Sequence, residues 1–140
     1  MPLVYAEWSL QAISDDTRPR LAAGVDAIET ARIQATLDRF GRRFLERVYT
    51  ENEQRYSRGR PEELAVRFAG KEALSKALGT GMRGVSWREL EILNNKRGKP
   101  FVRLHGAAAA RAEQLGLTAF EISLTHSRDL AIAFVVATTD

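Results

Sequence analysis

Two acidic residues and a lysine stand in a pattern that could hold a divalent cation and a phosphate group. Asp26 follows a short run of small and apolar residues, while Glu72 and Lys76 lie four residues apart in a segment rich in alanine and leucine. Hard cations such as Mg²⁺ bind oxygen ligands, often one or two carboxylates together with phosphate oxygens and water. A lysine one helical turn beyond Glu72 could neutralise a phosphate. This set suits phosphoryl-type transfer, in which positioning and charge neutralisation carry most of the catalysis.

Each of these residues also has a purely structural interpretation. Glu72 and Lys76 would share a helical sector with Phe68 and Ala69, so they could form an i,i+4 ion pair, which contributes a few tenths of a kcal/mol. Such pairs normally face solvent, and a pair on a packed face needs compensating partners or a function. Asp26 could cap a following helix. The residue pattern alone leaves both interpretations open.

The surroundings of Asp26 are compatible with the binding interpretation, although a helix cap is the commoner role for an aspartate at such a position. In a strand, Ala22 and Gly24 would share a face with Asp26, because side chains alternate between the two faces. These small residues would leave room for a bulky group to approach the carboxylate. We therefore expect open space beside Asp26.

Arginines gather between residues 32 and 47, at Arg32, Arg39, Arg42, Arg43 and Arg47. Guanidinium groups form forked hydrogen bonds with carboxylates and phosphates, which favours a docking surface for an acidic protein. The interspersed Asp38 and Glu46 fit an ordinary solvated helix face equally well. The formal net charge of +3 also favours an anionic partner, such as a nucleotide phosphate, an acidic protein or a nucleic acid.

Composition excludes several other chemistries. The 140 residues include no cysteine, which rules out disulfides, thiolate metal sites and cysteine nucleophiles. With two histidines, a histidine metal site is not expected; His105 reads as a surface residue and His126 opens a turn. No Rossmann or phosphate-loop glycine pattern occurs. No apolar run is long enough for a bilayer and no secretory signal opens the chain, so we expect a cytoplasmic protein.

The elements that must position these residues change in character along the chain. A nearly unbroken apolar run near the C-terminus predicts the middle strand of a sheet. Thr50 and Glu53 match a capping box, which predicts a helix start. We expect a helical stretch from residue 28 to a break near residues 48–49, and helices at 50–57, 61–78 and 106–115. We expect strands at 21–27, 89–93, 101–104, 119–125 and 130–137. The fold class is α+β, with helices mainly in the N-terminal half and an antiparallel sheet mainly in the C-terminal half. Residues 1–20 read as an N-terminal extension of unknown role, and residues 21–140 as one domain.

From Leu21 onward, the sequence resembles the short, trimeric holo-acyl-carrier-protein synthases, a class of the 4′-phosphopantetheinyl transferases. The most specific segment is Arg-Phe-Ala followed by Lys-Glu-Ala-x-x-Lys, at 67–76. The other segments that carry the resemblance are 24–29 with Arg32-Ile33, 44–53, 77–81, 98–100 and 123–127. Two positions depart from the family pattern: Gly70 and Ala27 replace larger residues, and a helical glycine costs about 1 kcal/mol relative to alanine.

The resemblance implies a Mg²⁺-dependent reaction, with Mn²⁺ as a possible substitute. Phosphopantetheine would pass from coenzyme A to a serine of apo acyl carrier protein, giving holo carrier protein and 3′,5′-ADP. The catalytic residues would be Asp26, Glu72 and Lys76. The metal ligands would be Asp26 and Glu72, and Lys76 would steady the phosphates or the leaving group. Either a metal-bound water or Glu72 itself would take the serine proton.

The resemblance also assigns binding residues and partners. Coenzyme A would contact Arg67, Lys76, Gly79, Lys99, Pro100 and His126. The acidic carrier protein would dock on Arg32, Arg39 and Arg43. The family forms homotrimers with the site between subunits, and neither nucleic acid nor membrane is an expected partner.

Two other function classes compete with this interpretation. A non-enzymatic basic module that binds RNA or an acidic protein would explain the arginines, but not Glu72 and Lys76. A hotdog-fold acyl-coenzyme A thioesterase would also be α+β. It would use coenzyme A without a magnesium site, so its activity would persist in excess chelator.

Overall fold

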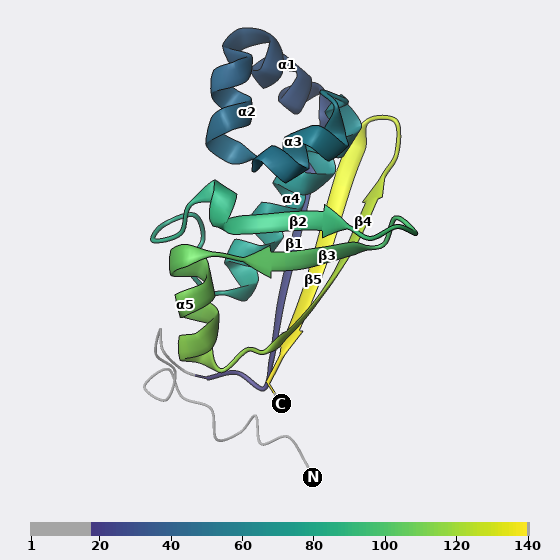
Figure 1. The fold of residues 1–140 in the computed structure, drawn as a ribbon. Helices are drawn as coiled ribbons and strands as arrows, with labels where there is room; N and C mark the ends of the chain where they lie inside the picture. The colour runs from purple at the N-terminus through teal and green to yellow at the C-terminus, as the bar shows by residue number, and fades with distance from the viewer. Residues whose placement is uncertain (1–17, 140) are drawn as a thin grey trace.

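The computed structural model describes residues 18–139 of the chain and shows an α+β fold (Figure 1). Most of the proposed N-terminal extension lies outside this range. The elements, in order, are β1 (Leu21–Glu29), α1 (Thr30–Phe40), α2 (Arg42–Val48), α3 (Glu51–Ser57), α4 (Pro61–Ala77), η3 (Trp87–Glu89), β2 (Leu90–Asn94), β3 (Pro100–Leu104), α5 (Gly106–Leu115), β4 (Ala119–His126) and β5 (Leu130–Thr138).

Three strands form the larger antiparallel sheet, in the order β1-β5-β4. The apolar strand β5 is central, as its composition predicts. The register places Asp26 beside Ala133, and Ala133 beside Leu124. Alternation along the strands gives one buried face, with Ala133 and Val135 fully buried, and one face that exposes Val25 and Phe134. Strands β2 and β3 form a separate antiparallel pair.

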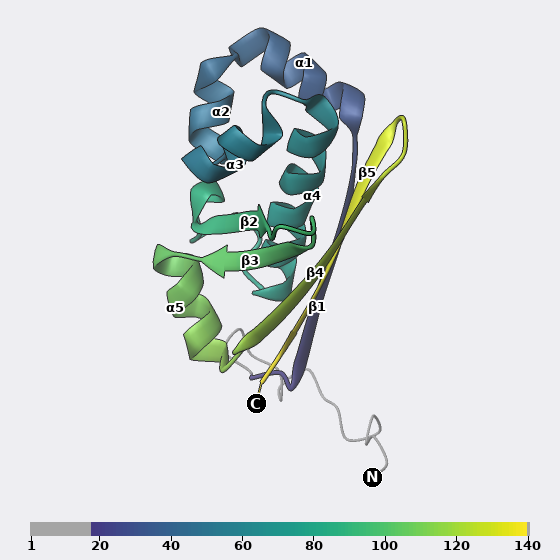
Figure 2. The ribbon, with the colours of Figure 1, turned by 45° about the vertical axis from the view of Figure 1, so that its right-hand side comes forward.

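Helix α4 runs between these two sheets and is buried on nearly every side (Figure 2). Two glycines permit this packing. A Cβ on Gly24 of β1 would lie 1.9 Å from the carbonyl oxygen of Ala73, so the strand meets the helix backbone directly. A Cβ on Gly70 would lie 2.3 Å from Cδ1 of Ile92 on β2. Gly70 therefore lowers the helix propensity of α4 but allows β2 to approach the helix closely.

The expected continuous helix from residue 28 is wrong at its start and at Gly41, whereas the expected break near residues 48–49 is confirmed by the end of α2 at Val48. Strand β1 continues to Glu29, because Ile28 and Glu29 still pair with β5, opposite Ala131 and Leu130. The helix then breaks at Gly41, where φ is +54°, a conformation that glycine adopts without strain. Its apolar positions continue in register into α2, which is why the spacing alone suggested one helix.

The capping box at α3 is confirmed. Thr50 Oγ1 accepts a hydrogen bond from the Glu53 amide at 3.2 Å, and the Thr50 amide donates to Glu53 Oε1 at 2.9 Å. Among the helices that the structure describes, none is both long and apolar enough to cross a membrane.

Candidate active site

The structure brings Asp26, Glu72 and Lys76 together where β1 meets the last turns of α4. Lys76 Nζ donates to Asp26 Oδ1 at 3.2 Å and to the backbone carbonyl of Val25 at 2.9 Å. The capping interpretation of Asp26 is wrong, because the N-cap residue of α1 is Glu29. Residues 50 positions apart in sequence thus meet on an edge strand of the sheet.

The expectation that Glu72 and Lys76 lie on a packed face is wrong for Lys76. Its side chain is 51% exposed, while Glu72 is half-buried. Ala73 and Ala77 take the packed position, because they are the residues that meet Gly24. Glu72 and Lys76 each precede one of these alanines and therefore lie at the margin of the contact.

The open space expected beside Asp26 is also absent at Gly24. The backbone of α4 fills it at Ala73, so the small residue serves helix packing. Open space lies instead in a cavity of about 290 Å³ whose lining includes Gly24, Val25 and Lys76.

The electrostatics of this cluster fit a divalent cation. Burial raises the pKa of Glu72, the negative charge of Asp26 raises it further, and Lys76 opposes both effects. Two neighbouring carboxylates repel each other, and a cation bound between them relieves this repulsion. Within residues 18–139, no third acidic, histidine or cysteine side chain completes a protein-only site. Mg²⁺ commonly uses one or two carboxylates and takes its other ligands from substrate phosphates and water, so the donor set fits.

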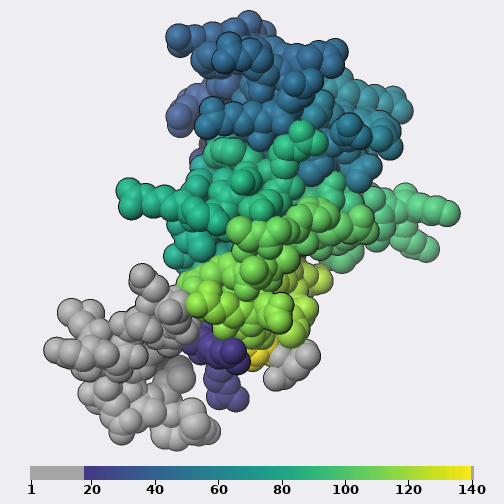
Figure 3. All heavy atoms as spheres, turned by 60° about the vertical axis from the view of Figure 1, so that its left-hand side comes forward, coloured from purple at the N-terminus to yellow at the C-terminus, as the bar shows by residue number. Residues whose placement is uncertain are grey.

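A second group of expected site residues lies at the opposite edge of the sheet, along β4. Lys99 and Pro100 line a cavity of about 350 Å³ together with residues of β4 and β5, among them Phe134. Lys99 Nζ contacts Glu121 Oε1 at 3.2 Å, and His126 ends β4 with an exposed side chain. The turn that precedes Pro100 projects from the molecular surface (Figure 3).

Arg67 belongs with this second group. Its guanidinium is fully buried, donates to Glu63 Oε1 at 2.9 Å and also donates to Asn94. Asn94 Nδ2 in turn donates to the carbonyl of Gly98 at 2.9 Å. Through Asn94, Arg67 therefore stabilises the turn that carries Lys99.

Gly79 has a different environment from the other expected coenzyme A residues. It follows the C-cap of α4 with φ of +74°, beside the Arg111 side chain. It is exposed, so a ligand that reaches the end of α4 can approach its backbone closely.

The three expected docking arginines are exposed on neighbouring helices. Arg32 and Arg39 lie on α1 and Arg43 lies on α2. Arg43 also lines a groove of about 310 Å³, bordered by α1, α2 and η3, which we call the docking groove. Its lining residues are Thr36, Phe40, Arg43, Phe44, Arg47, Val48 and Trp87. The groove combines an apolar floor with a basic rim.

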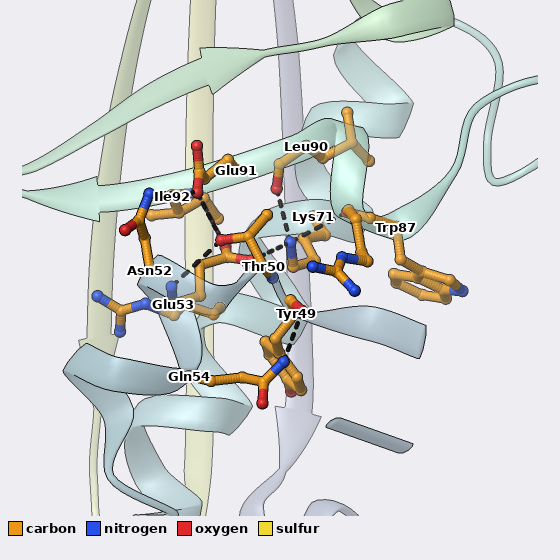
Figure 4. A network of polar contacts seen from close by, with 12 residues as sticks. Tyr49, Thr50, Asn52, Glu53, Gln54, Lys71, Trp87, Leu90, Glu91 and Ile92 are labelled. Carbon is orange, nitrogen blue, oxygen red and sulfur yellow. Dashed lines mark hydrogen bonds and ion pairs between the residues drawn. The ribbon is translucent and has the colours of Figure 1, made fainter. Parts of the chain in front are cut away.

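A buried polar network beside the docking groove was missed by sequence analysis (Figure 4). Glu53 and Lys71 are both fully buried and form an ion pair at 2.7 Å. Glu91 accepts hydrogen bonds from Thr50 at 2.5 Å and lies 2.9 Å from His105 Nε2. Burial alone would raise the pKa of Glu91, but hydrogen bonds from Thr50, His105 and Asn52 outweigh it and lower the pKa. The capping box marked Thr50 and Glu53, but nothing in the pattern indicated their partners.

Comparison with known proteins places this geometry in a family. Residues 22–135 match the family model described as the 4′-phosphopantetheinyl transferase superfamily. The chain belongs to the 4′-phosphopantetheinyl transferase superfamily. The match covers β1 and α4, which carry Asp26, Glu72 and Lys76.

Individual members of this superfamily are similar over most of their length. A holo-[acyl-carrier-protein] synthase of Herpetosiphon aurantiacus is 50% identical over 123 residues, which are 83% of this chain and 97% of the relative. The solved holo-[acyl-carrier-protein] synthase of Neisseria meningitidis has a TM-score of 0.77 and 36% identity, and the match covers 84% of this chain and 98% of that one.

A second solved transferase carries a ligand. The holo-[acyl-carrier-protein] synthase of Helicobacter pylori, in complex with coenzyme A, has a TM-score of 0.77 and 29% identity. The match covers 83% of this chain and 99% of that chain. The α+β fold expected from the sequence is confirmed by these likenesses.

Proposed function

We propose that this protein transfers 4′-phosphopantetheine from coenzyme A to a serine of apo acyl carrier protein. The observation that carries the proposal is the meeting of Asp26, Glu72 and Lys76 on an edge strand, in a chain similar to holo-[acyl-carrier-protein] synthases over most of its length. Neither competing class needs this arrangement. A basic binding module has no use for two coupled carboxylates, and a thioesterase has no pyrophosphate to neutralise.

In the reaction, the carrier serine Oγ attacks the phosphorus that bears pantetheine. The bond from that phosphorus to the bridging pyrophosphate oxygen breaks, and 3′,5′-ADP leaves. Asp26 and Glu72 would hold Mg²⁺, or Mn²⁺ in its place, which supplies charge neutralisation for the pyrophosphate when bound. Lys76 is exposed and carries a mobile ammonium group, so it can turn from Asp26 to a phosphate oxygen. Either Glu72 itself or a water held at the metal site would take the serine proton.

The decisive experiment measures the intact mass of an apo carrier protein after incubation with this protein, coenzyme A and Mg²⁺, with and without excess chelator. We expect a gain of one phosphopantetheine group that chelator abolishes. Coenzyme A hydrolysis that persists in chelator would favour the thioesterase class. A folded protein that modifies none of several carrier proteins, but binds RNA, would favour the basic module.

We also infer that the complete site lies between subunits of a homotrimer. The metal-site group lies on β1 and the Lys99 group lies along β4, and these are opposite edges of one sheet. The sheet face that turns away from α4 is apolar and exposed, with Val25 at 54% and Phe134 at 46%. Such a face favours burial against a partner. Packing of copies through this face would bring β1 of one chain to β4 of the next.

Mixing two inactive variants tests the shared site. Glu72→Gln removes the metal-site group and His126→Ala disables the β4 group, so each homotrimer should lose activity. Subunit exchange between the two should restore part of the activity, because some interfaces then combine two intact halves. Carrier modification by the mixture is compared with modification by each variant alone. A mixture no more active than its parts, after exchange has been verified by mass spectrometry, would contradict the shared site.

The docking groove and its basic rim are the proposed carrier surface. Replacing Arg32, Arg39 and Arg43 with Glu should raise the KM for carrier protein by about a hundredfold or more, since opposite charges become like charges across the contact. The KM for coenzyme A should change little, because these side chains are exposed on α1 and α2. Steady-state kinetics with each substrate varied in turn gives both constants. Equal effects on the two KM values would contradict the assignment.

A further inference from the structure

The buried lysine beside Glu72 has three hydrogen-bond acceptors, and one of them belongs to the docking groove. Lys71 Nζ donates to Glu53 Oε1 at 2.7 Å and to the carbonyls of Leu90 at 2.8 Å and Trp87 at 3.0 Å (Figure 4). An ammonium group has three donors, so this lysine is fully satisfied. It joins α3, α4, η3 and the start of β2 at a single point.

The hydrogen bond from Lys71 to the Trp87 carbonyl links α4 to the docking groove, because Trp87 lines that groove. Its ring stacks on Phe68 with centroids 4.7 Å apart and planes inclined by 27°. Phe68 and Lys71 lie one turn apart on α4. The helix therefore holds Trp87 twice, through the ring at Phe68 and through the backbone carbonyl at Lys71.

We propose that Lys71, paired with Glu53, is a positioning residue for the carrier-protein substrate. It fixes the Trp87 wall of the docking groove relative to α4, whose next residue is Glu72. The inference rests on the proposed function, because it assumes that the carrier docks in this groove.

The buried ion pair carries an energetic cost of its own. Burial lowers the pKa of Lys71, the cost expected for a charge removed from water, although Glu53 opposes the shift. Replacing a buried ion pair with neutral side chains of similar volume is often neutral or stabilising, whereas removing one partner is destabilising. What an apolar replacement cannot supply is the hydrogen bond to the Trp87 carbonyl.

The test uses the double variant Lys71→Met/Glu53→Gln, which removes both charges. It is made in a Trp8→Phe background, so that Trp87 is the remaining tryptophan of the two in the sequence. We expect the KM for carrier protein to rise about tenfold, roughly 1.4 kcal/mol of lost binding, with the KM for coenzyme A within about twofold. Acrylamide should quench Trp87 fluorescence more strongly than in the parent.

The matched control is Thr50→Val, which disturbs the same capping box but leaves Lys71 and the Trp87 carbonyl in contact. Its carrier KM and its quenching should match the parent. If the double variant does not fold, Phe68→Leu tests the same wall from the ring side and should reproduce both effects. Unchanged carrier KM and quenching in the folded variant would overturn the inference.

One measurement distinguishes failure of the positioning role of Lys71 from failure of carrier docking in the groove. Apo carrier protein is titrated into the parent while Trp87 fluorescence is recorded. A response in the parent, with identical affinity in the double variant, overturns the positioning role alone. No response from an active parent places carrier docking elsewhere and removes both proposals.

Discussion

Glu72→Gln should lower turnover by about a hundred- to a thousandfold, the range found when one preorganised electrostatic group is lost at a reacting phosphate or acyl centre. Glutamine keeps the shape of the side chain but removes the charge that would hold the proposed cation together with Asp26. Raising the Mg²⁺ concentration should recover little of the loss, because a neutral amide can neither replace an anionic metal ligand nor accept a proton. Turnover is measured from intact-mass time courses of carrier protein at saturating coenzyme A.

The same substitution should leave the unfolding midpoint unchanged or slightly higher. The raised pKa of Glu72 means that the folded chain disfavours this charge in the absence of metal. Glu62→Gln, in the first turn of the same helix, is the matched control. It should keep turnover near wild type and lose only the small stabilisation of a carboxylate near a helix N-terminus, about 0.3–1 kcal/mol. Near-wild-type turnover of Glu72→Gln would show that the metal site has been misplaced.

Gly24→Ala should destabilise the protein and abolish transfer together. The added Cβ would lie 1.9 Å from the Ala73 carbonyl oxygen and 3.1 Å from the Ala77 amide nitrogen. Both are helix backbone atoms, so no side-chain rotation relieves the clash, and β1 and α4 must separate. Asp26 then moves away from Glu72 and Lys76. We expect a loss of more than about 4 kcal/mol in unfolding free energy, measured by urea denaturation.

Gly70→Ala is the informative companion, because its clash differs in kind. The added Cβ would meet Ile92 Cδ1 at 2.3 Å, which is the tip of a flexible side chain. Repacking costs about 1–3 kcal/mol, and the better helix propensity of alanine returns up to about 1 kcal/mol. This variant should keep much of its activity. A Gly24→Ala protein as stable as Gly70→Ala would contradict the direct strand–helix contact.

Local signals in the sequence predicted much of the fold. The capping box at Thr50 and Glu53, the apolar run of β5 and the alanine-rich α4 each specify their element within a few neighbouring residues. The pairing of Ile28 with β5 is different, because it depends on a strand about a hundred residues later. A local pattern therefore could not show that β1 extends through it.

The candidate site was predicted by residue type, but its environment was not. Helical spacing correctly grouped Glu72 with Lys76, yet it placed Lys76 in the packed sector. The backbone contact of Gly24 with Ala73 decides which side of α4 is covered, and that contact joins distant segments. Lys71 was passed over for a related reason. Lysine is rarely buried, and its acceptors on Trp87 and Leu90 are backbone carbonyls, which no side-chain pattern reveals.

In the proposed homotrimer, the placement of the two site groups on opposite edge strands would make activity a property of the assembly. Each chain would then carry two half-sites that belong to different reaction centres, so dilution below the dissociation constant of the trimer should silence every chain at once. A copy inactive in both half-sites would also act as a dominant negative, because it spoils the two centres that it shares with intact neighbours. The cell's supply of holo carrier protein would then depend on subunit concentration more steeply than on the number of active chains.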